Sequence, residues 1–177
     1  MALAIGSPMV AFKLKNVDGK MISADELSKG KQATVIIFSC NHCPYVQAWE
    51  DRMIQLGNTY GLRGVAFALI NANDPVNYPE DSYPEMVRRA KSKGYPFAYL
   101  HDEDQSAARA YGATRTPEVF LFDAQGILRY HGRIDDNYEE PNRVRSQELK
   151  DALEAVLAGQ TPSVSETPVV GCTVKWR

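Results

Sequence analysis

The sequence has few cysteines, no excess of either charge and no long apolar run. Three cysteines among 177 residues are too few, and an odd number, for a secreted scaffold built on disulfides. Lys and Arg total 20 against 22 Asp and Glu, so the net charge is −2. A charge so close to zero gives no electrostatic reason to expect nucleic acid or an anionic membrane as a partner. No stretch reaches the roughly 18 apolar residues that span a bilayer.

The first eight residues lack the basic start and the apolar core of a secretory signal. This predicts a cytoplasmic protein, although a chain whose leader has been removed would look the same. Apolar residues make up 44% and charged residues 24% of the chain, as in ordinary globular domains. A chain of this length can bury a substantial core and is expected to form one domain.

Hydrophobic patterning predicts strands that alternate with helices. The run at 33–38 is continuous and β-branched, which is typical of a strand buried on both faces. The helix predicted to start at Cys43 places its apolar residues on one face, namely Val46, Trp49, Met53, Leu56 and Tyr60. The other predicted elements are a hairpin at 10–23, a helical turn at 23–27, strands at 65–70, 97–100, 119–122 and 127–134, helices at 85–93, 105–111 and 146–157, and loops at 71–84 and 135–140.

This order of elements predicts an α/β fold with a mixed central sheet, covered by helices on both faces and preceded by an N-terminal β-hairpin. No domain boundary interrupts residues 1–157, so they are expected to form one domain. Residues 158–177 lie outside the pattern and are predicted to be a tail packed on that domain.

Cys40 and Cys43 form a Cys-x-x-Cys motif between the buried strand and the helix. The free N–H groups and the dipole of the helix start are expected to stabilise a thiolate on Cys40. The spacing lets the two sulfurs close a small disulfide that another thiol can reopen. Cys43, expected to be the more buried thiol, is placed to attack a mixed disulfide on Cys40 and release the product. The pair therefore indicates thiol–disulfide chemistry.

His42 lies between the two cysteines. A partly protonated imidazole there is expected to lower the pKa of Cys40 and make the disulfide more oxidising. The alternative is half of a zinc site, but a structural zinc ion usually takes four ligands and the chain has no second Cys-x-x-Cys. Recruitment of Cys172 and a histidine would complete such a site. We expect redox chemistry without a bound metal or another cofactor.

Two separated motifs give the chain a resemblance to the thioredoxin-like superfamily, and in particular to its redoxin branch, the alkyl hydroperoxide reductase/thiol-specific antioxidant-like proteins and related thiol–disulfide oxidoreductases. The resemblance rests on the strand at 35–38, the motif Cys-Asn-His-Cys-Pro at 40–44, the segment at 110–122 and the hairpin at 123–130. It covers about residues 8–157 in the order of elements. The resemblance implies a three-layer α/β/α fold.

The resemblance also implies roles for individual residues. It makes Cys40 the attacking thiol and Cys43 the resolving thiol, and it makes the Thr116-Pro117 bond cis and places it against the disulfide. Because Pro117 starts a strand, the backbone of Thr116 is expected to be unpaired, so that a substrate peptide lying across Cys40 can hydrogen-bond there.

The chain departs from this superfamily at two points. Redoxins that reduce peroxides carry Pro-x-x-x-Thr-x-x-Cys around a lone cysteine, and the segment before Cys40 has neither that proline nor that spacing. Thioredoxins proper have a tryptophan before the first cysteine, where this chain has Ser39, and a buried acid in the strand beneath, which is uncharged here. The base that takes the proton of Cys43 therefore stays open among His42, Glu118 and water.

The expected function is thiol–disulfide exchange with a disulfide-bearing protein or a small-thiol substrate, driven by a thiol electron donor. In a reducing cytoplasm the expected direction is reduction of the partner. One alternative is a thiol-dependent peroxidase with an antioxidant role. The second is a copper chaperone without turnover, for which His131 would be the distant ligand. Cys172 is either a third thiol near the pair or a buried or idle cysteine, and His101 and His131 are predicted to have no role in the chemistry.

Overall fold

A computed structural model describes residues 1–177. Its strands are β1 (Lys13–Asn16), β2 (Met21–Ser23), β3 (Ala33–Phe38), β4 (Val65–Asn71), β5 (Ala98–His101), β6 (Arg115–Thr116), β7 (Glu118–Asp123), β8 (Leu128–Gly132) and β9 (Cys172–Thr173). Its α-helices are α1 (Ala24–Ser28), α2 (Pro44–Gly61), α3 (Tyr83–Lys93), α4 (Ser106–Tyr111) and α5 (Glu148–Leu157), and its 3₁₀ helices are η1 (Pro79–Asp81) and η2 (Pro141–Arg143).

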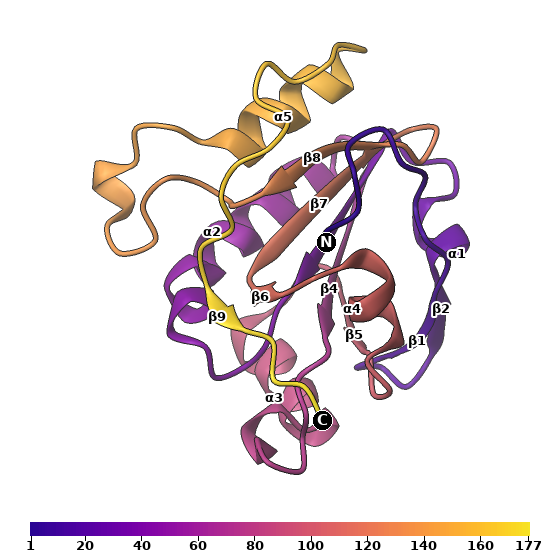
Figure 1. The fold of residues 1–177 in the computed structure, drawn as a ribbon, viewed down its shortest axis with the longest axis vertical. Helices are drawn as coiled ribbons and strands as arrows, with labels where there is room; N and C mark the ends of the chain where they lie inside the picture. The colour runs from indigo at the N-terminus through magenta and orange to yellow at the C-terminus, as the bar shows by residue number, and fades with distance from the viewer.

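Seven strands form the central sheet in the order β2-β1-β5-β4-β3-β7-β8 (Figure 1). β3 lies parallel to β4, and β4 lies parallel to β5, whereas the remaining pairs are antiparallel. The sheet is therefore mixed, with an N-terminal hairpin at one edge, as the sequence predicts. No helix combines the length and the apolar composition that crossing a membrane requires.

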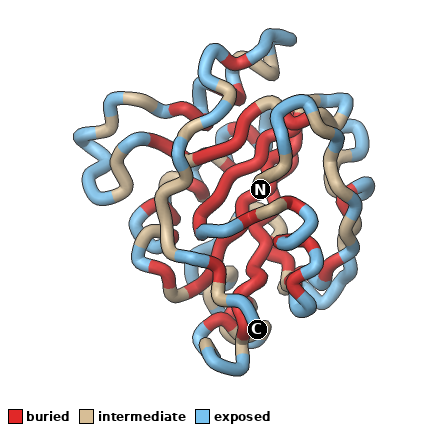
Figure 2. Tube along the Cα trace, viewed as in Figure 1, coloured by how far each residue is buried: buried red, intermediate tan, exposed pale blue.

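Alternate residues of β3 face two separate cores. The central strands β3 and β4 are buried at every residue (Figure 2). Val35 and Ile37 pack in a cluster with residues of α2, α3 and α5. Ile36 and Phe38 pack in a second cluster with residues of α4 and of the N-terminal segment. Because both faces are covered, the predicted strand buried on two sides is confirmed, and its carboxyl end at Phe38 is held rigidly.

Helix α2 begins directly after Cys43, which is its N-cap residue. Pro44 occupies the first turn, where the missing N–H has no intrahelical partner in any case. The predicted apolar face is confirmed, since Trp49, Met53 and Tyr60 are at most 1% exposed. The helix therefore starts at the cysteine pair and is anchored along its length in the core.

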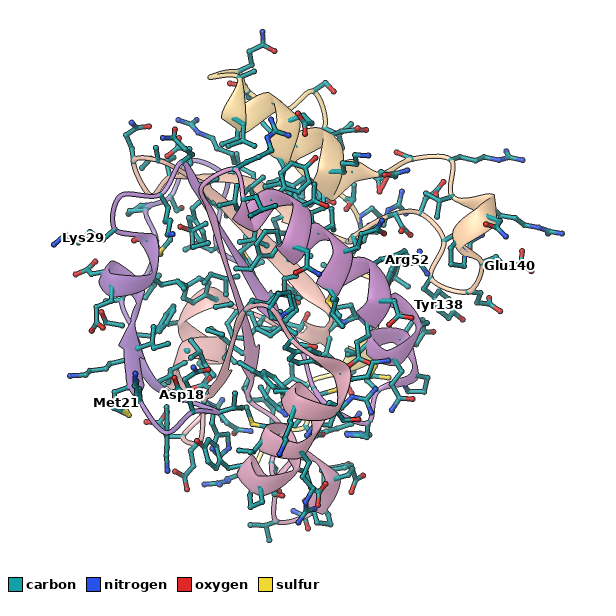
Figure 3. All side chains as sticks on the ribbon, turned by 180° about the vertical axis from the view of Figure 1, so that it is seen from behind. Asp18, Met21, Lys29, Arg52, Tyr138 and Glu140 are labelled. Carbon is teal, nitrogen blue, oxygen red and sulfur yellow. The ribbon has the colours of Figure 1, made fainter.

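The structure differs from the sequence prediction mainly at the chain's irregular parts. Helix α3 begins at Tyr83, two residues earlier than expected, after the short turn η1. The acidic loop at 135–140 is expected from its charges to be solvated. This expectation is wrong for Asp135, because Trp49 Nε1 donates to its Oδ1 at 2.9 Å and the Arg52 guanidinium binds its other oxygen at 2.6 Å. Figure 3 shows Arg52 on α2 beside the loop that carries Tyr138, whose carbonyl accepts a further bond of 2.6 Å.

The C-terminal tail packs on the domain, as predicted, but it also forms a strand that the sequence did not reveal. Residues 158–177 run from α5 across the surface, and β9 pairs with β6 in a second, two-stranded sheet (Figure 1). Val174, next to β9, is buried at 4% exposure. The tail is therefore part of the structure around the cysteine pair.

Candidate functional site

Cys40 and Cys43 lie where β3 ends and α2 begins, as the sequence predicts. Both are fully buried and both are free thiols. The equal burial contradicts the expectation that Cys43 is the more covered of the two. Its physical reason is that Thr116 lies against both sulfurs and that both cysteines belong to the buried core.

Thr116 connects the two sulfurs. Its hydroxyl Oγ1 lies 3.5 Å from Cys40 Sγ, and its carbonyl oxygen accepts a hydrogen bond from Cys43 Sγ at 3.4 Å. The Thr116-Pro117 peptide bond is cis, which confirms that prediction. The backbone edge of Thr116 is not free, however, because Cys172 of β9 lies opposite it in antiparallel register. The expectation of an unpaired edge is wrong, since the tail supplies the missing strand.

The two cysteines shift each other's pKa in opposite directions. A hydrogen bond from the Cys40 thiol lowers the pKa of Cys43 to about 4 against the effect of burial, and Cys172 and the backbone N–H of Val46 add to this. The same bond to Cys43, together with burial and the charge of Asp81, raises the pKa of Cys40 well above its usual value. The predicted lowering of the Cys40 pKa is therefore wrong, because the hydrogen bond to Cys43, burial and the charge of Asp81 all raise it.

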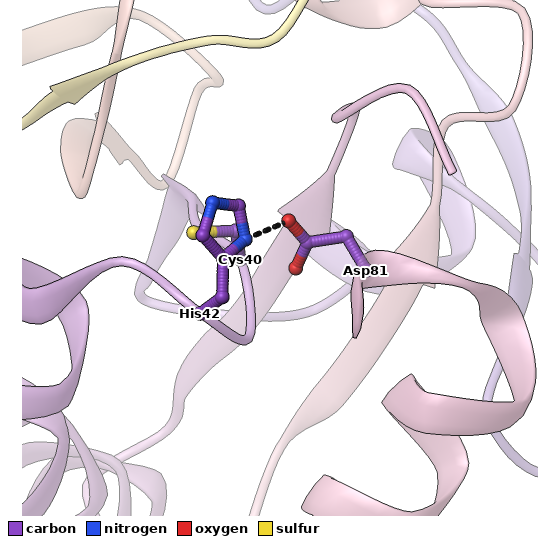
Figure 4. Close-up of side chains that lie close together, drawn as sticks. All are labelled: Cys40, His42 and Asp81. Atoms are coloured by element: carbon purple, nitrogen blue, oxygen red, sulfur yellow. Dashed lines mark ion pairs between the residues drawn. The ribbon is translucent and has the colours of Figure 1, made fainter. Parts of the chain in front are cut away.

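Asp81 is the functional residue that sequence reasoning missed. It is completely buried, at the end of η1. Its Oδ1 accepts a bond of 2.6 Å from the backbone N–H of Asn41, and its Oδ2 accepts one of 3.0 Å from Asn73. The carboxylate also pairs with the imidazole of His42 (Figure 4). Asp81 belongs to the segment at 71–97, which is called the insertion below. It is a buried acid beside the cysteines, whereas the strand beneath them is uncharged.

Three groups at this site could share a metal ion. The sulfur of Cys40, a ring nitrogen of His42 and a carboxylate oxygen of Asp81 all lie within 4.8 Å of one another (Figure 4). A thiolate and an imidazole suit a thiophilic metal, but three ligands are one fewer than structural zinc sites use. Cys43 is hydrogen-bonded to Cys40 and to the carbonyl of Thr116 and is not a fourth member of this group.

His131 and Glu118 bind each other instead of the cysteines. His131 Nε2 lies 2.8 Å from Glu118 Oε2, and His131 Nδ1 lies 3.1 Å from Glu166 Oε2. The other oxygen of Glu118 accepts from the backbone N–H groups of Thr114 and Arg115. With both ring nitrogens engaged, His131 is unavailable as a copper ligand, and Glu118 is already paired and does not serve as the base for Cys43.

The stability of the protein is expected to fall as the pH rises above about 6.5, the usual pKa of histidine. Burial disfavours the charged ring, but the carboxylates of Glu118 and Glu166 outweigh it and raise the pKa of His131. The stabilisation is complete below the unfolded pKa and is lost as the pH passes the folded one. Urea denaturation of the wild type and of His131→Gln at a series of pH values measures this. The stability difference between them should shrink with rising pH, and a constant difference contradicts the assignment.

Asp81→Asn is expected to lower the pKa of Cys40, because the charge of Asp81 helps to raise it. The measurement is the pH dependence of thiolate ultraviolet absorbance in a Cys43→Ser background, where the neighbouring thiol no longer contributes. Glu80→Gln is the matched control, since Glu80 is adjacent in sequence but exposed. An unchanged Cys40 pKa in Asp81→Asn, or an equal shift in Glu80→Gln, contradicts the role assigned to Asp81.

Comparison with known proteins gives three findings that agree with this geometry. Residues 5–131 match the AhpC/TSA family. The chain is 31% identical over 149 residues to the thiol:disulfide interchange protein DsbE of Escherichia coli strain K12, covering 82% of this chain and 72% of that protein. An uncharacterized conserved protein from Geobacillus kaustophilus has a crystal structure that superimposes with a TM-score of 0.92 and 39% identity, over 98% of this chain and 93% of that one.

A more distant likeness concerns the fold alone. The thioredoxin domain of a thiol-disulfide oxidoreductase from Bacteroides vulgatus superimposes with a TM-score of 0.61 at 15% identity, over 72% of this chain and 86% of that domain. The predicted thioredoxin-like α/β fold is therefore confirmed.

Proposed function

The chain belongs to the AhpC/TSA family and to the thiol–disulfide oxidoreductases within it, and on that basis we propose that it exchanges its dithiol with disulfides of protein or small-thiol substrates. The observation that carries this proposal is the arrangement of Cys40 and Cys43 at the start of α2, with Thr116 within 3.5 Å of both sulfurs. The pair can close into a disulfide without rearrangement of the core, because strand and helix hold both residues in place.

The exchange proceeds in two balanced steps. The Cys40 thiolate attacks one sulfur of the substrate disulfide, the substrate S–S bond breaks, and the released sulfur takes a proton. Cys43 then attacks Cys40 in the mixed disulfide, which yields the Cys40–Cys43 disulfide and the second substrate thiol. The helix N–H that lowers the Cys43 pKa supports the second step without a separate base. A thiol electron donor returns the pair to the dithiol.

The segment before Cys40 favours this role over peroxide reduction. It has neither the proline nor the spacing of the Pro-x-x-x-Thr-x-x-Cys signature that peroxide-reducing redoxins carry. His42 is engaged with Asp81 and positions the loop between the cysteines. Its effect on the redox potential stays a prediction.

Three parallel assays on the purified wild type test the proposal: reduction of insulin disulfides driven by dithiothreitol, consumption of a hydroperoxide driven by the same dithiol, and Cu(I) binding. We expect disulfide reduction to exceed the rate without protein clearly, and hydroperoxide consumption to stay near that background. Hydroperoxide turnover without disulfide reduction would replace the proposal by the peroxidase alternative. Stoichiometric Cu(I) binding without either turnover would replace it by the chaperone alternative.

A further inference from the structure

The tail occupies the backbone edge at Thr116, where the sequence predicts that a substrate peptide binds. In β9, Cys172 lies opposite Thr116 and Thr173 lies opposite Arg115, in antiparallel register. A substrate peptide that adds a strand at Thr116 would make the same backbone pairing. The residue of the tail at the position next to the redox pair is itself a cysteine. The chain therefore presents a cysteine-bearing strand of its own at this site.

Several contacts hold the tail in this position. The backbone N–H of Val174 donates to the Thr114 carbonyl at 2.9 Å, and Arg115 Nη1 donates to the Gly171 carbonyl at 2.9 Å. On the other side, the N–H of Lys175 donates to Asn73 Oδ1 at 2.8 Å, so the tail also joins the 71–97 insertion. These contacts fix the backbone on both sides of Cys172.

Close approach at Gly171 makes the fit specific. A Cβ added to Gly171 would lie 2.1 Å from the carbonyl oxygen of Thr116, which is closer than any real contact of this kind. The tail can therefore pair with β6 at this depth only because residue 171 has no side chain. This brings Cys172 against the cluster that contains both redox cysteines.

We propose that Cys172 is a third redox-active thiol, which the tail presents to the Cys40–Cys43 disulfide as an internal substrate. This inference rests on the proposed function, because it needs that disulfide to form. The Cys172 thiolate attacks Cys43 Sγ, the Cys40–Cys43 bond breaks and a Cys43–Cys172 bond forms. Cys40 leaves as a thiolate and takes up the proton that Cys172 lost. One disulfide replaces another, so no oxidant or reductant is consumed.

The charges around Cys172 agree with this step. Burial and the ionised Cys43 raise the pKa of Cys172 to about 11 in the reduced protein, while Lys175 lowers it. In the Cys40–Cys43 disulfide, Cys43 carries no charge, so its contribution is absent and Cys172 ionises more readily. Burial and the charge of Asp81 raise the pKa of Cys40 independently of Cys43, so the released Cys40 sulfur takes up the proton.

Disulfide mapping tests the proposal. Protein is equilibrated in a glutathione buffer, alkylated, and digested with trypsin, which releases peptides 32–52 and 151–175. A Cys40–Cys43 disulfide lies within peptide 32–52, whereas a Cys43–Cys172 disulfide joins the two peptides. In Cys40→Ser, monomeric protein is expected to give the joined peptides as its main disulfide. In Gly171→Ala, the yield of joined peptides should fall several-fold because β9 is displaced.

Gly61→Ala is the matched control, since a Cβ at Gly61 meets nothing within 4 Å, and it should keep the wild-type yield. The proposal is overturned if Cys40→Ser gives no joined peptides in a buffer where the wild type forms the Cys40–Cys43 disulfide. That result would leave the proposed function standing. Absence of any disulfide on peptide 32–52 in wild-type protein, whether within it or to peptide 151–175, would instead contradict the proposed function, and the internal-substrate step with it.

Discussion

Cys40→Ser and Cys43→Ser are each expected to lower dithiol-driven disulfide reduction by roughly 10³-fold or more, the scale seen when an enzyme loses its nucleophile. A hydroxyl at either position can neither attack a disulfide nor close the internal one at neutral pH. Both side chains are fully buried and of similar size to serine, so the fold should survive. Insulin reduction measures the effect, and circular dichroism checks the fold. Unchanged reduction by Cys40→Ser would sink the central hypothesis.

The same two variants also establish the order of attack, which stays a prediction. If Cys40 attacks first, Cys43→Ser should accumulate a mixed disulfide with substrate on Cys40, because the resolving thiol is missing. If Cys43, the cysteine with the lowered pKa, attacks first instead, the mixed disulfide should form on Cys43 in Cys40→Ser. Mass mapping of the trapped species separates these outcomes.

Trp49→Ala is expected to destabilise the protein by about 3–5 kcal/mol, the usual cost of removing a buried aromatic ring. Trp49 is 1% exposed in the core that anchors α2. The substitution leaves a cavity and also removes one of three donors to the Asp135 carboxylate, so that Arg52 and the backbone N–H of Asn137 remain. Urea denaturation followed by circular dichroism measures the loss.

Trp49→Phe separates the two contributions, because it keeps most of the ring and removes the hydrogen bond. It is expected to cost about 1.5–3 kcal/mol, the range for the loss of one hydrogen bond to a charged group. A loss in Trp49→Ala below about 1 kcal/mol, or an equal loss in both variants, would show that the ring does not anchor α2 as the packing indicates.

Hydrophobic periodicity was sufficient to predict the layered fold. The continuous apolar run at 33–38 requires burial on both sides, and the single apolar face of α2 requires burial on one side. Both are found. The cysteine motif could be placed because its position depends only on these two elements. The cis bond at Pro117 was inferred from the resemblance and is present in the structure.

The parts that sequence analysis missed depend on contacts between distant segments. Nothing local distinguishes Asp81 from other acids in a polar loop, and it becomes buried because the insertion folds against Asn41 and His42. β6 and β9 contain two residues each, too few to show a period, and they pair across 56 positions of sequence. The predicted lowering of the Cys40 pKa is wrong because it considers neither the hydrogen bond between the two thiols nor the burial and the charge of Asp81.

The most direct test of the central claim is a single turnover without added reductant. Reduced Cys172→Ser protein, in which only Cys40 and Cys43 can pair, is mixed with an excess of insulin, quenched by alkylation and mapped. The account predicts that one insulin disulfide is reduced for each Cys40–Cys43 disulfide formed. This disulfide is detected as a loss of two hydrogens from peptide 32–52. Insulin reduction without a disulfide in peptide 32–52, or no reduction at all, would contradict it.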